Sequence, residues 1–456
     1  MTRAHPWSYH EAIRYLSARA GYDRGFVANP FGDEGAGLER TRHLLALVGN
    51  PHQQYPVVHI AGTKGKGSTA AFIATIAHAA GYRTGLYTSP HLHTFRERFQ
   101  LDHQPLAPDV FATLLQELAS ANEHLAAAHP DLGEATAFEL TTALAFLAFA
   151  RADVDIAVIE VGLGGRLDAT NVVLPTVAAI TRIGFDHMHI LGNTLDAIAR
   201  EKAGIIKPGR PVVSAPQAPE AAAVIIATAA QQNALLWLGD RDWHVWGTPE
   251  AFTYVGPGGQ LEGLRSGLLG QHQMENAGVA ITIAHSLSQQ GIDVPDTAIR
   301  HGVAAVRWPG RLEVVQERPT IVLDAAHNRE SAQALATALR THFQWAHLTA
   351  IIGLARDKDL LAFLTPLLPL CTRLIAVPTH SPRIRAPEEI VEVTRQLRPH
   401  VDAMTAPSVA AALALAREQA GVDDLIVATG SLTVVAEARE ALGLASADPD
   451  ERALLG

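Results

Sequence analysis

Cysteine is nearly absent from this sequence, which has a single one, Cys371, among 456 residues. One thiol can neither form an intrachain disulfide nor supply a thiolate cage for a metal, so a disulfide-stapled secreted fold is excluded. A chain without disulfides suits a reducing compartment, and we expect this protein in the cytoplasm.

Long hydrophobic runs are also missing. The most apolar run, ALAFLAFA at 143–150, ends at Arg151 and is far shorter than the ~20 residues that a membrane-spanning helix needs. The first residues, MTRAHPWSYHEAIRYL, lack the apolar core and the small-residue cleavage site of a signal peptide. The sequence therefore predicts no membrane partner.

Positive charge is in short supply, because 36 Lys and Arg stand against 46 Asp and Glu and give a net charge of −10. No basic run offsets this locally, which argues against nucleic acid as a partner. The composition is still compatible with a small basic pocket that binds an anionic ligand. The chain shows no heptad stripe or evident dimer helix, so we expect a monomer.

The pattern of apolar segments predicts two α/β domains, in a chain too long for one ordinary core. Residues 1–306 read as a mostly parallel sheet flanked by helices, with a small antiparallel insertion at 246–270. After the predicted linker RWPGRLE (307–313), the alternation restarts as a smaller Rossmann-like α/β domain, 307–456. In the first domain we predict strands at 83–88, 155–161, 176–183 and 211–215, helices at about 108–128, 136–151 and 195–205, and a pair of helices at about 271–305.

The segment AGTKGKGS follows an apolar strand pattern and opens a helical one. It departs from the usual phosphate loop, since Ile60 replaces the first glycine and Ser68 follows Lys66 one place late. Its three glycines would let backbone N–H groups converge on an anion. A tight glycine-rich turn is the alternative, but two lysines where the helix dipole disfavours cations favour a bound anion.

Polar residues end several predicted strands. A carboxylate such as Glu160, closing an apolar strand, is costly to bury without a partner, and a strand end beside a phosphate loop suits Mg²⁺; a solvated strand end is the alternative. Asp186, His187 and His189 follow another strand in a predicted loop, which leaves metal ligands and an ordinary surface loop equally open.

Two further features are weaker when taken alone. Lys202 lies in the last turns of a predicted helix, where cations are ordinarily favourable. The segment DAAHN places Asp324 and His327 at a strand end in the second domain. Neither pattern by itself indicates a catalytic or binding site.

AGTKGKGS closely resembles the phosphate loop of the Mur ligase superfamily, in the form found in folylpolyglutamate synthases and dihydrofolate synthases. Nine further segments resemble motifs of that family, in its order, between about residues 38 and 435: LERTRHLLALVGNPH, TSPHLHTFRER, TAFELTTALAF, VIEVGLGGRLDATNVV, FDHMHILGNTLDAIAREKAGIIKPG, GQHQMENA, WPGRLE, DAAHN and ATGSL. The departures are Lys64 in place of Asn, DAAHN in place of DGAHN, and SPRIRAP near 381 in a variable region.

The resemblance implies an ATP-dependent acid–amino-acid ligase that adds L-glutamate to a reduced folate, to 7,8-dihydropteroate, or to both. ATP would phosphorylate the acceptor carboxylate, the amine of glutamate would attack the acyl phosphate, and ADP and phosphate would leave. In the family ATP sits between the domains, and closure would exclude water from an intermediate that hydrolyses.

The resemblance also implies the ATP-binding residues, which come from both predicted domains. Lys66 and Arg311 would neutralise charge on the transferring phosphoryl group, and His327 would contact the γ-phosphate. The whole set is Gly62, Thr63, Gly65, Lys66, Gly67, Ser68, His272, Asn276, Arg311, Asp324 and His327.

Metal and acceptor sites are carried over in the same way. Mg²⁺, at two sites, would be held by Ser89, Glu160 and His187. Lys202 matches the carbamylated lysine of the family, and a carbamate would remove the repulsion that an ammonium exerts on Mg²⁺. The matches to the pterin pocket are Phe138 and Asp186.

Three alternative functions explain less of the sequence. A cell-wall Mur ligase carries a nucleotide-sugar domain for which the 61 residues before Gly62 are too few. A P-loop kinase or GTPase would not need the second α/β domain. An ATP-binding scaffold without ligase activity would not need Lys66, Glu160, His187 and Lys202 together, and substrate-dependent ADP release would distinguish it.

Overall fold

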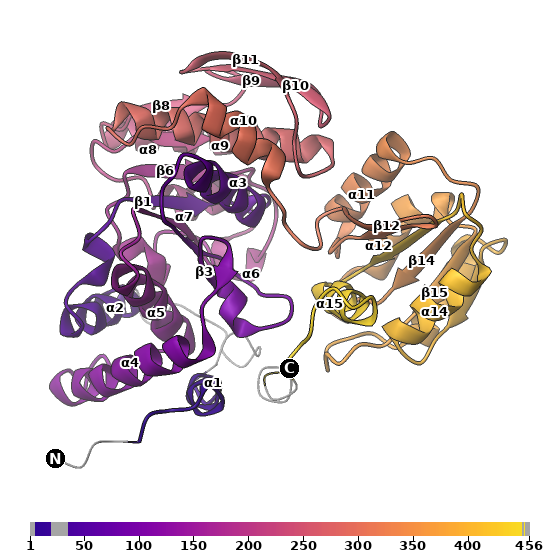
Figure 1. Ribbon diagram of the computed structural model, residues 1–456, viewed down its shortest axis with the longest axis horizontal. Helices are drawn as coiled ribbons and strands as arrows, with labels where there is room; N and C mark the ends of the chain where they lie inside the picture. The colour runs from indigo at the N-terminus through magenta and orange to yellow at the C-terminus, as the bar shows by residue number, and fades with distance from the viewer. Residues whose placement is uncertain (1–4, 20–34, 449–450, 452–456) are drawn as a thin grey trace. The chain divides into compact units, whose positions relative to one another are not determined.

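The structure, a computed structural model, describes residues 5–19, 35–448 and 451 (Figure 1). These form two compact units. The first takes in the chain to His91, then Phe95–Gly267 and Gln273–Val306. The second is Arg307 onward, together with the short segments Leu92–Thr94 and Leu268–His272.

The first unit is built on an eight-stranded sheet. Six strands pair in parallel, and β3 and β4 form an antiparallel edge that the sequence reading did not predict. The prediction of a mostly parallel α/β fold is confirmed. In spatial order the strands are β4 (Gln104–Pro105), β3 (Phe99–Leu101), β2 (Thr84–Tyr87), β5 (Ile156–Glu160), β1 (Val57–Ala61), β6 (Val177–Ile180), β7 (Val212–Ser214) and β8 (Leu236–Leu238).

The central strands are buried on both faces, which explains their nearly continuous apolar sequences. Every residue of β1 and β5 is buried. Ala61, Ala178 and Val212 share a core with side chains of α7 and α8. His59 is the polar exception in β1; it lies on the same face as Ala61, two residues away.

Ten α-helices belong to the described part of the first unit. Their starts follow local rules: α4 begins with Pro108, and Thr136 and Glu139 form a capping box at the start of α5. The prediction that Met188–Leu191 forms a loop was wrong, since this segment is a single helical turn. The helices are α1 (Tyr9–Ser17), α2 (Ala36–Leu47), α3 (Lys66–Ala79), α4 (Pro108–Ala128), α5 (Ala137–Arg151), α6 (Met188–Leu191), α7 (Leu195–Ala203), α8 (Pro219–Gln231), α9 (Gln271–Gln289) and α10 (Asp296–Ala305).

The predicted antiparallel insertion is present as a three-stranded sheet of β9 (His244–Thr248), β10 (Ala251–Gly256) and β11 (Gly259–Leu264). Figure 1 shows it as a separate small sheet close to α9 and α10. Its anchor is Tyr254, buried and within 2.9 Å of the Thr282 hydroxyl on α9.

The second unit has a six-stranded sheet with helices on both faces. Val322, Ala350 and Val427 pack with α11, α12 and α13, whereas the alternating residues Ile321 and Ile351 pack with α14 and α15. The strand order is β12 (Glu313–Glu317), β13 (Thr320–Leu323), β17 (Leu425–Thr429), β14 (Leu348–Ile352), β15 (Arg373–Ala376) and β16 (Asp402–Thr405). The helices are α11 (Arg329–His342), α12 (Leu360–Leu367), α13 (Pro387–Leu397), α14 (Val409–Gln419) and α15 (Leu432–Ala441).

Candidate active site

The phosphate loop lies at the carboxyl end of the central strand β1, where ligands bind in open α/β sheets. Two of its glycines have backbone angles that favour glycine, with φ of +149° at Gly62 and +89° at Gly65. A Cβ at Gly62 would lie 1.9 Å from the Thr181 hydroxyl oxygen, and one at Gly65 would lie 2.2 Å from Oδ1 of Asn276. The loop is therefore packed between α9 and the residue directly after β6, and Asn276, one of the predicted ATP-binding residues, lies beside it.

The backbone N–H groups of the loop fall into two sets: some bond to the neighbouring backbone, and others face the space where an anion can bind. The amides of Thr63 and Lys64 both donate to the Arg182 carbonyl, at 3.0 and 3.1 Å. The Thr63 hydroxyl donates to the Gly184 carbonyl at 3.1 Å. Since α3 begins at Lys66, its first-turn amides have no acceptor within the helix and are the groups directed at an anion. Gly67 and Ser68 belong to this turn.

Lys66 faces the carboxylate at the end of β5. Its Nζ lies 3.8 Å from Oε1 of Glu160, and both side chains are largely buried. The other carboxylate oxygen accepts the backbone N–H of Ser89 at 3.2 Å. Three residues predicted from separate motifs are thus gathered at the ends of β1, β2 and β5.

The side chain of Lys202, on α7, also lies at the phosphate loop. Its Nζ donates to the Gly62 carbonyl at 2.9 Å, and the residue is only 4% exposed. Burial, and then the charge of Lys66, lower the pKa of Lys202 to about 7, against the opposing charges of Asp186 and Asp168. Lys202 is therefore held largely as a neutral amine at mildly alkaline pH, unlike an ordinary lysine.

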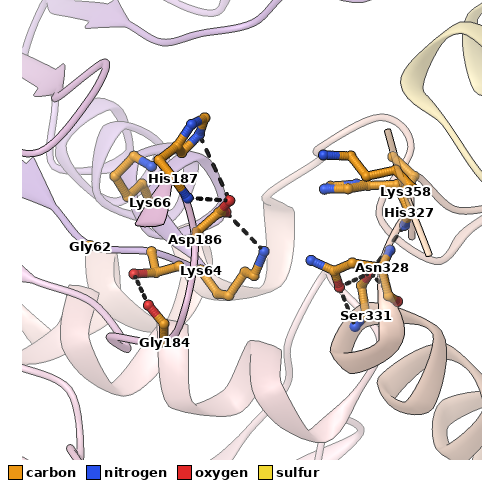
Figure 2. A network of polar contacts seen from close by, with 12 residues as sticks. Gly62, Lys64, Lys66, Gly184, Asp186, His187, His327, Asn328, Ser331 and Lys358 are labelled. Atoms are coloured by element: carbon orange, nitrogen blue, oxygen red, sulfur yellow. Dashed lines mark hydrogen bonds and ion pairs between the residues drawn. The ribbon is translucent and has the colours of Figure 1, made fainter. Parts of the chain in front are cut away.

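Asp186 lies between Lys64 and His187, as Figure 2 shows. Its Oδ2 is 3.3 Å from the Lys64 ammonium, and its Oδ1 accepts the His187 N–H at 3.0 Å. Burial would raise the pKa of Asp186, but the charges of Lys64 and His187 outweigh it and hold the pKa below its ordinary value. Burial lowers the pKa of His187; Asp186 opposes this shift and the charges of Lys66 and Lys202 add to it. A neutral imidazole is the form that binds metals.

Phe138 lies near the start of α5, against Gly162. A Cβ at Gly162 would lie 2.4 Å from the Phe138 ring and 3.3 Å from Oδ2 of Asp168. Asp168 is buried and accepts the amides of Leu163 and Thr170 at 2.9 and 3.0 Å. Sequence reasoning did not single out Asp168; the signal was its place in GRLDATN, eight residues after Glu160.

The predicted residues of the second unit form their own cluster. Asp324 is partly buried, and its two oxygens accept the amides of Leu312 and Ala326 at 2.8 and 2.9 Å. Burial raises the pKa of Asp324, against the nearby charges of Arg311 and His327.

His327 is held by its ring and by its backbone. Its Nδ1 lies 2.9 Å from the Ala325 carbonyl, which can only accept, so Nδ1 carries the proton. Its amide donates to Ser331, which Asn328 also contacts (Figure 2). His272, near the start of α9, groups with this unit, whereas Asn276 of the same motif groups with the first.

Metal ligands are sparse in the part of the chain that the structure describes. No group of three or more His, Cys, Asp and Glu side chains there is placed to hold an ion by itself. None of the described helices is long and apolar enough to cross a membrane.

Comparisons with known proteins identify the family of this chain. The family described as Mur ligase middle domain matches residues 60–284, and the glutamate ligase domain of Mur ligases matches residues 310–432. The chain is 38% identical to folylpolyglutamate synthase of Lacticaseibacillus casei over 88% of its length and 92% of that protein. It is 40% identical to the dihydrofolate synthase/folylpolyglutamate synthase of Bacillus subtilis over 71% of its length and 76% of that protein.

A solved structure shows the same fold over nearly the whole chain. Escherichia coli FolC in complex with DHPP and ADP has a TM-score of 0.82 and 31% identity, covering 96% of this chain and 98% of that one. Sequence, domain matches and fold therefore agree with the family resemblance seen in the motifs. The chain belongs to the folylpolyglutamate synthase/dihydrofolate synthase family of Mur ligases.

Proposed function

We propose that this protein is an ATP-dependent ligase that adds L-glutamate to reduced folates and to 7,8-dihydropteroate, releasing ADP and phosphate. The observation that carries the proposal is the Lys66–Glu160 pair at the phosphate loop, in a chain of this family. The FolC structure with DHPP and ADP supports both a nucleotide and a small-molecule acceptor. A monomeric state and a cytoplasmic location stay predictions.

The chemistry requires a carboxylate to become an acyl donor, which it does poorly while its leaving group is oxide. Phosphorylation by ATP replaces oxide with phosphate, and the amine of glutamate then attacks the acyl phosphate. The residues act mainly by positioning and by electrostatics. The first-turn amides of α3 and the Lys66 ammonium would hold the phosphates, with Asn276 beside the loop at Gly65.

The residues present fit a Mg²⁺ ion that arrives with the nucleotide. Mg²⁺ prefers oxygen ligands and is commonly held by one or two carboxylates plus substrate phosphates. Glu160 supplies the carboxylate, and Ser89 and His187 are the other proposed ligands, although imidazole is a less usual choice for this ion. When bound, Mg²⁺ would neutralise charge on the phosphates. The second metal site rests on the family resemblance.

Carbamylation of Lys202 is the second proposed feature. A carbamate forms when a neutral amine attacks CO₂ and its nitrogen then releases a proton to solvent, and a pKa of about 7 keeps this amine neutral where an ordinary lysine is charged. The product is an anion on a buried side chain next to Lys66, whose positive charge would stabilise it.

The acceptor pocket is proposed at Phe138. Support comes from the aromatic ring at the start of α5, packed over Gly162 and close to the buried carboxylate of Asp168. Asp186, the other predicted pterin contact, is engaged with Lys64 and His187. Its role in acceptor binding stays a prediction, as do the roles of Arg311, Asp324 and His327.

The proposal is tested by ADP release from purified protein with ATP, Mg²⁺ and L-glutamate, comparing 7,8-dihydropteroate with tetrahydrofolate. We expect turnover with both acceptors and a loss of about 100-fold or more in Lys66→Ala, as for removal of a transition-state donor elsewhere. Turnover with only one of the two acceptors would show that the enzyme uses that acceptor class and not the other. No glutamate-dependent ADP with either acceptor would reject the ligase and favour an ATP-binding scaffold.

A further inference from the structure

The segment Thr181–Gly184, directly after β6, is the support on which the phosphate loop rests. Its Arg182 carbonyl accepts the amides of Thr63 and Lys64, and its Gly184 carbonyl accepts the Thr63 hydroxyl. The Thr181 side chain fills the space beside Gly62. We call Thr181–Gly184 the support segment. Its position determines where the loop begins.

The support segment also leads into the predicted metal ligands. Asp186 and His187 follow Gly184 after one residue, so a shift of the segment moves them together with the phosphate loop. The Arg182 guanidinium is tied to α9 by two bonds to the Glu275 carboxylate, at 2.9 and 2.5 Å. Glu275 precedes Asn276, which lies against Gly65.

Gln217, between β7 and α8, forms hydrogen bonds to the backbone of the support segment. Its Oε1 accepts the Ile183 N–H at 3.0 Å. Its Nε2 donates to the Thr181 carbonyl at 3.1 Å and to the Ser214 hydroxyl at 3.2 Å. One amide thus satisfies a donor and an acceptor two residues apart in the support segment, which neither a carboxylate nor an aliphatic side chain can do.

We infer that Gln217 is a positioning residue for nucleotide and metal binding, acting through the support segment. Without its amide, Ile183 N–H and Thr181 C=O lose their partners, and the part-buried segment must move to satisfy them. The phosphate loop would then lose its pre-set geometry, which costs affinity for the bound nucleotide. The inference rests on the proposed function in that the loop binds ATP.

The chain offers a matched control in Gln116 of α4. Its Oε1 accepts the Trp7 N–H at 3.1 Å and its Nε2 donates to the His5 carbonyl at 3.0 Å. This is the same two-residue bridge, made to a segment that has no bond to the phosphate loop. Gln217→Met and Gln116→Met therefore remove the same chemistry from two places.

The test is the Kd of MgATP by calorimetry without acceptor, together with the Mg²⁺ concentration for half-maximal turnover and the unfolding temperature. We expect Gln217→Met to raise the Kd about five-fold or more, the equivalent of one net hydrogen bond, and to raise the Mg²⁺ requirement. Gln116→Met should lower the unfolding temperature by a similar amount but leave the Kd of MgATP and the Mg²⁺ requirement unchanged. Gln217→Glu keeps the bond from Ile183 but places a carboxylate oxygen against the Thr181 carbonyl, so it should also raise the Kd.

An unchanged Kd in Gln217→Met, or an equal change in Gln116→Met, would overturn the inference. If Gln217→Met does not fold, Gln217→Glu and Ser214→Ala take its place, and an unchanged Kd in both would count against it equally. Binding is measured without turnover, so a wild-type protein that binds MgATP but ligates nothing rejects the proposed ligase and still tests Gln217.

Discussion

The Nζ of Lys202 donates a hydrogen bond of 2.9 Å to the carbonyl oxygen of Gly62, the first glycine of the phosphate loop. The two residues are 140 positions apart, on α7 and at the end of β1. A lysine at the end of a helix is ordinarily a solvated cation. Here the side chain is buried next to a second lysine, and its chemistry changes accordingly.

A carbamate on Lys202 should be visible directly. After equilibration with ¹³C-bicarbonate at pH 8, we expect a carbamate carbon resonance in the wild-type protein, since this amine is largely neutral there. Lys202→Met should lose the resonance. Lys207→Met is the control for a second lysine whose pKa burial lowers, to about 8, and it should keep the resonance. If the resonance is kept in Lys202→Met and lost in Lys207→Met, the carbamate is on Lys207 and the prediction is wrong.

Gly162→Ala tests the acceptor pocket. The new methyl group would lie 2.4 Å from the Phe138 ring and must displace it. We expect a rise of about ten-fold in the KM of the folate acceptor, the effect of ~1.4 kcal/mol, with the KM of ATP unchanged. Adding Phe138→Leu should recover part of the space. Equal rises in both KM values would show a general distortion instead.

His59 should make the protein sensitive to acid. Burial lowers its pKa to about 3, and its Nε2 lies 2.9 Å from the Thr170 hydroxyl. Unfolded His59 takes up a proton near pH 6.5 while the folded form stays neutral, so stability present above pH 6.5 is lost as the pH falls towards 3. Between pH 7.5 and 5, urea unfolding should show about 2 kcal/mol more loss for wild type than for His59→Asn.

The control for this prediction is His244→Asn, which removes an exposed histidine from β9. It should follow the wild-type pH dependence. If His59→Asn also loses stability as steeply as wild type, another buried group is responsible; His52, whose pKa burial lowers to about 4, would be the next to change.

Asp324→Asn should destabilise the second unit. Both carboxylate oxygens accept backbone N–H groups, and an amide would turn its own NH₂ towards one of them. A donor shielded from water and left without a partner costs up to about 1–3 kcal/mol, which urea unfolding can measure. Asp402→Asn, at an exposed ion pair with Arg373, should change stability by less than about 1 kcal/mol. Similar losses in both variants would argue against this role of Asp324.

The sequence was sufficient where the signal is local. Strand, glycine-rich turn and helix around Lys66 follow from neighbouring residues, and Glu160 ends β5 as its apolar run predicts. The predicted helix at 108–128 is confirmed residue for residue as α4. Short edge strands were missed, because β4 (QP) and β16 (DAMT) carry too few apolar residues for a periodic pattern.

The order of its motifs also let the sequence alone identify the family and hence the chemistry to look for. What only the tertiary structure decided is which distant residues share an environment. The lowered pKa of Lys202, the place of Asp168 beside Gly162, and the bridge from Gln217 to the support segment all join residues far apart in the chain. Burial and hydrogen bonding depend on atoms within a few ångströms in space, and the folded sheet brings those atoms together.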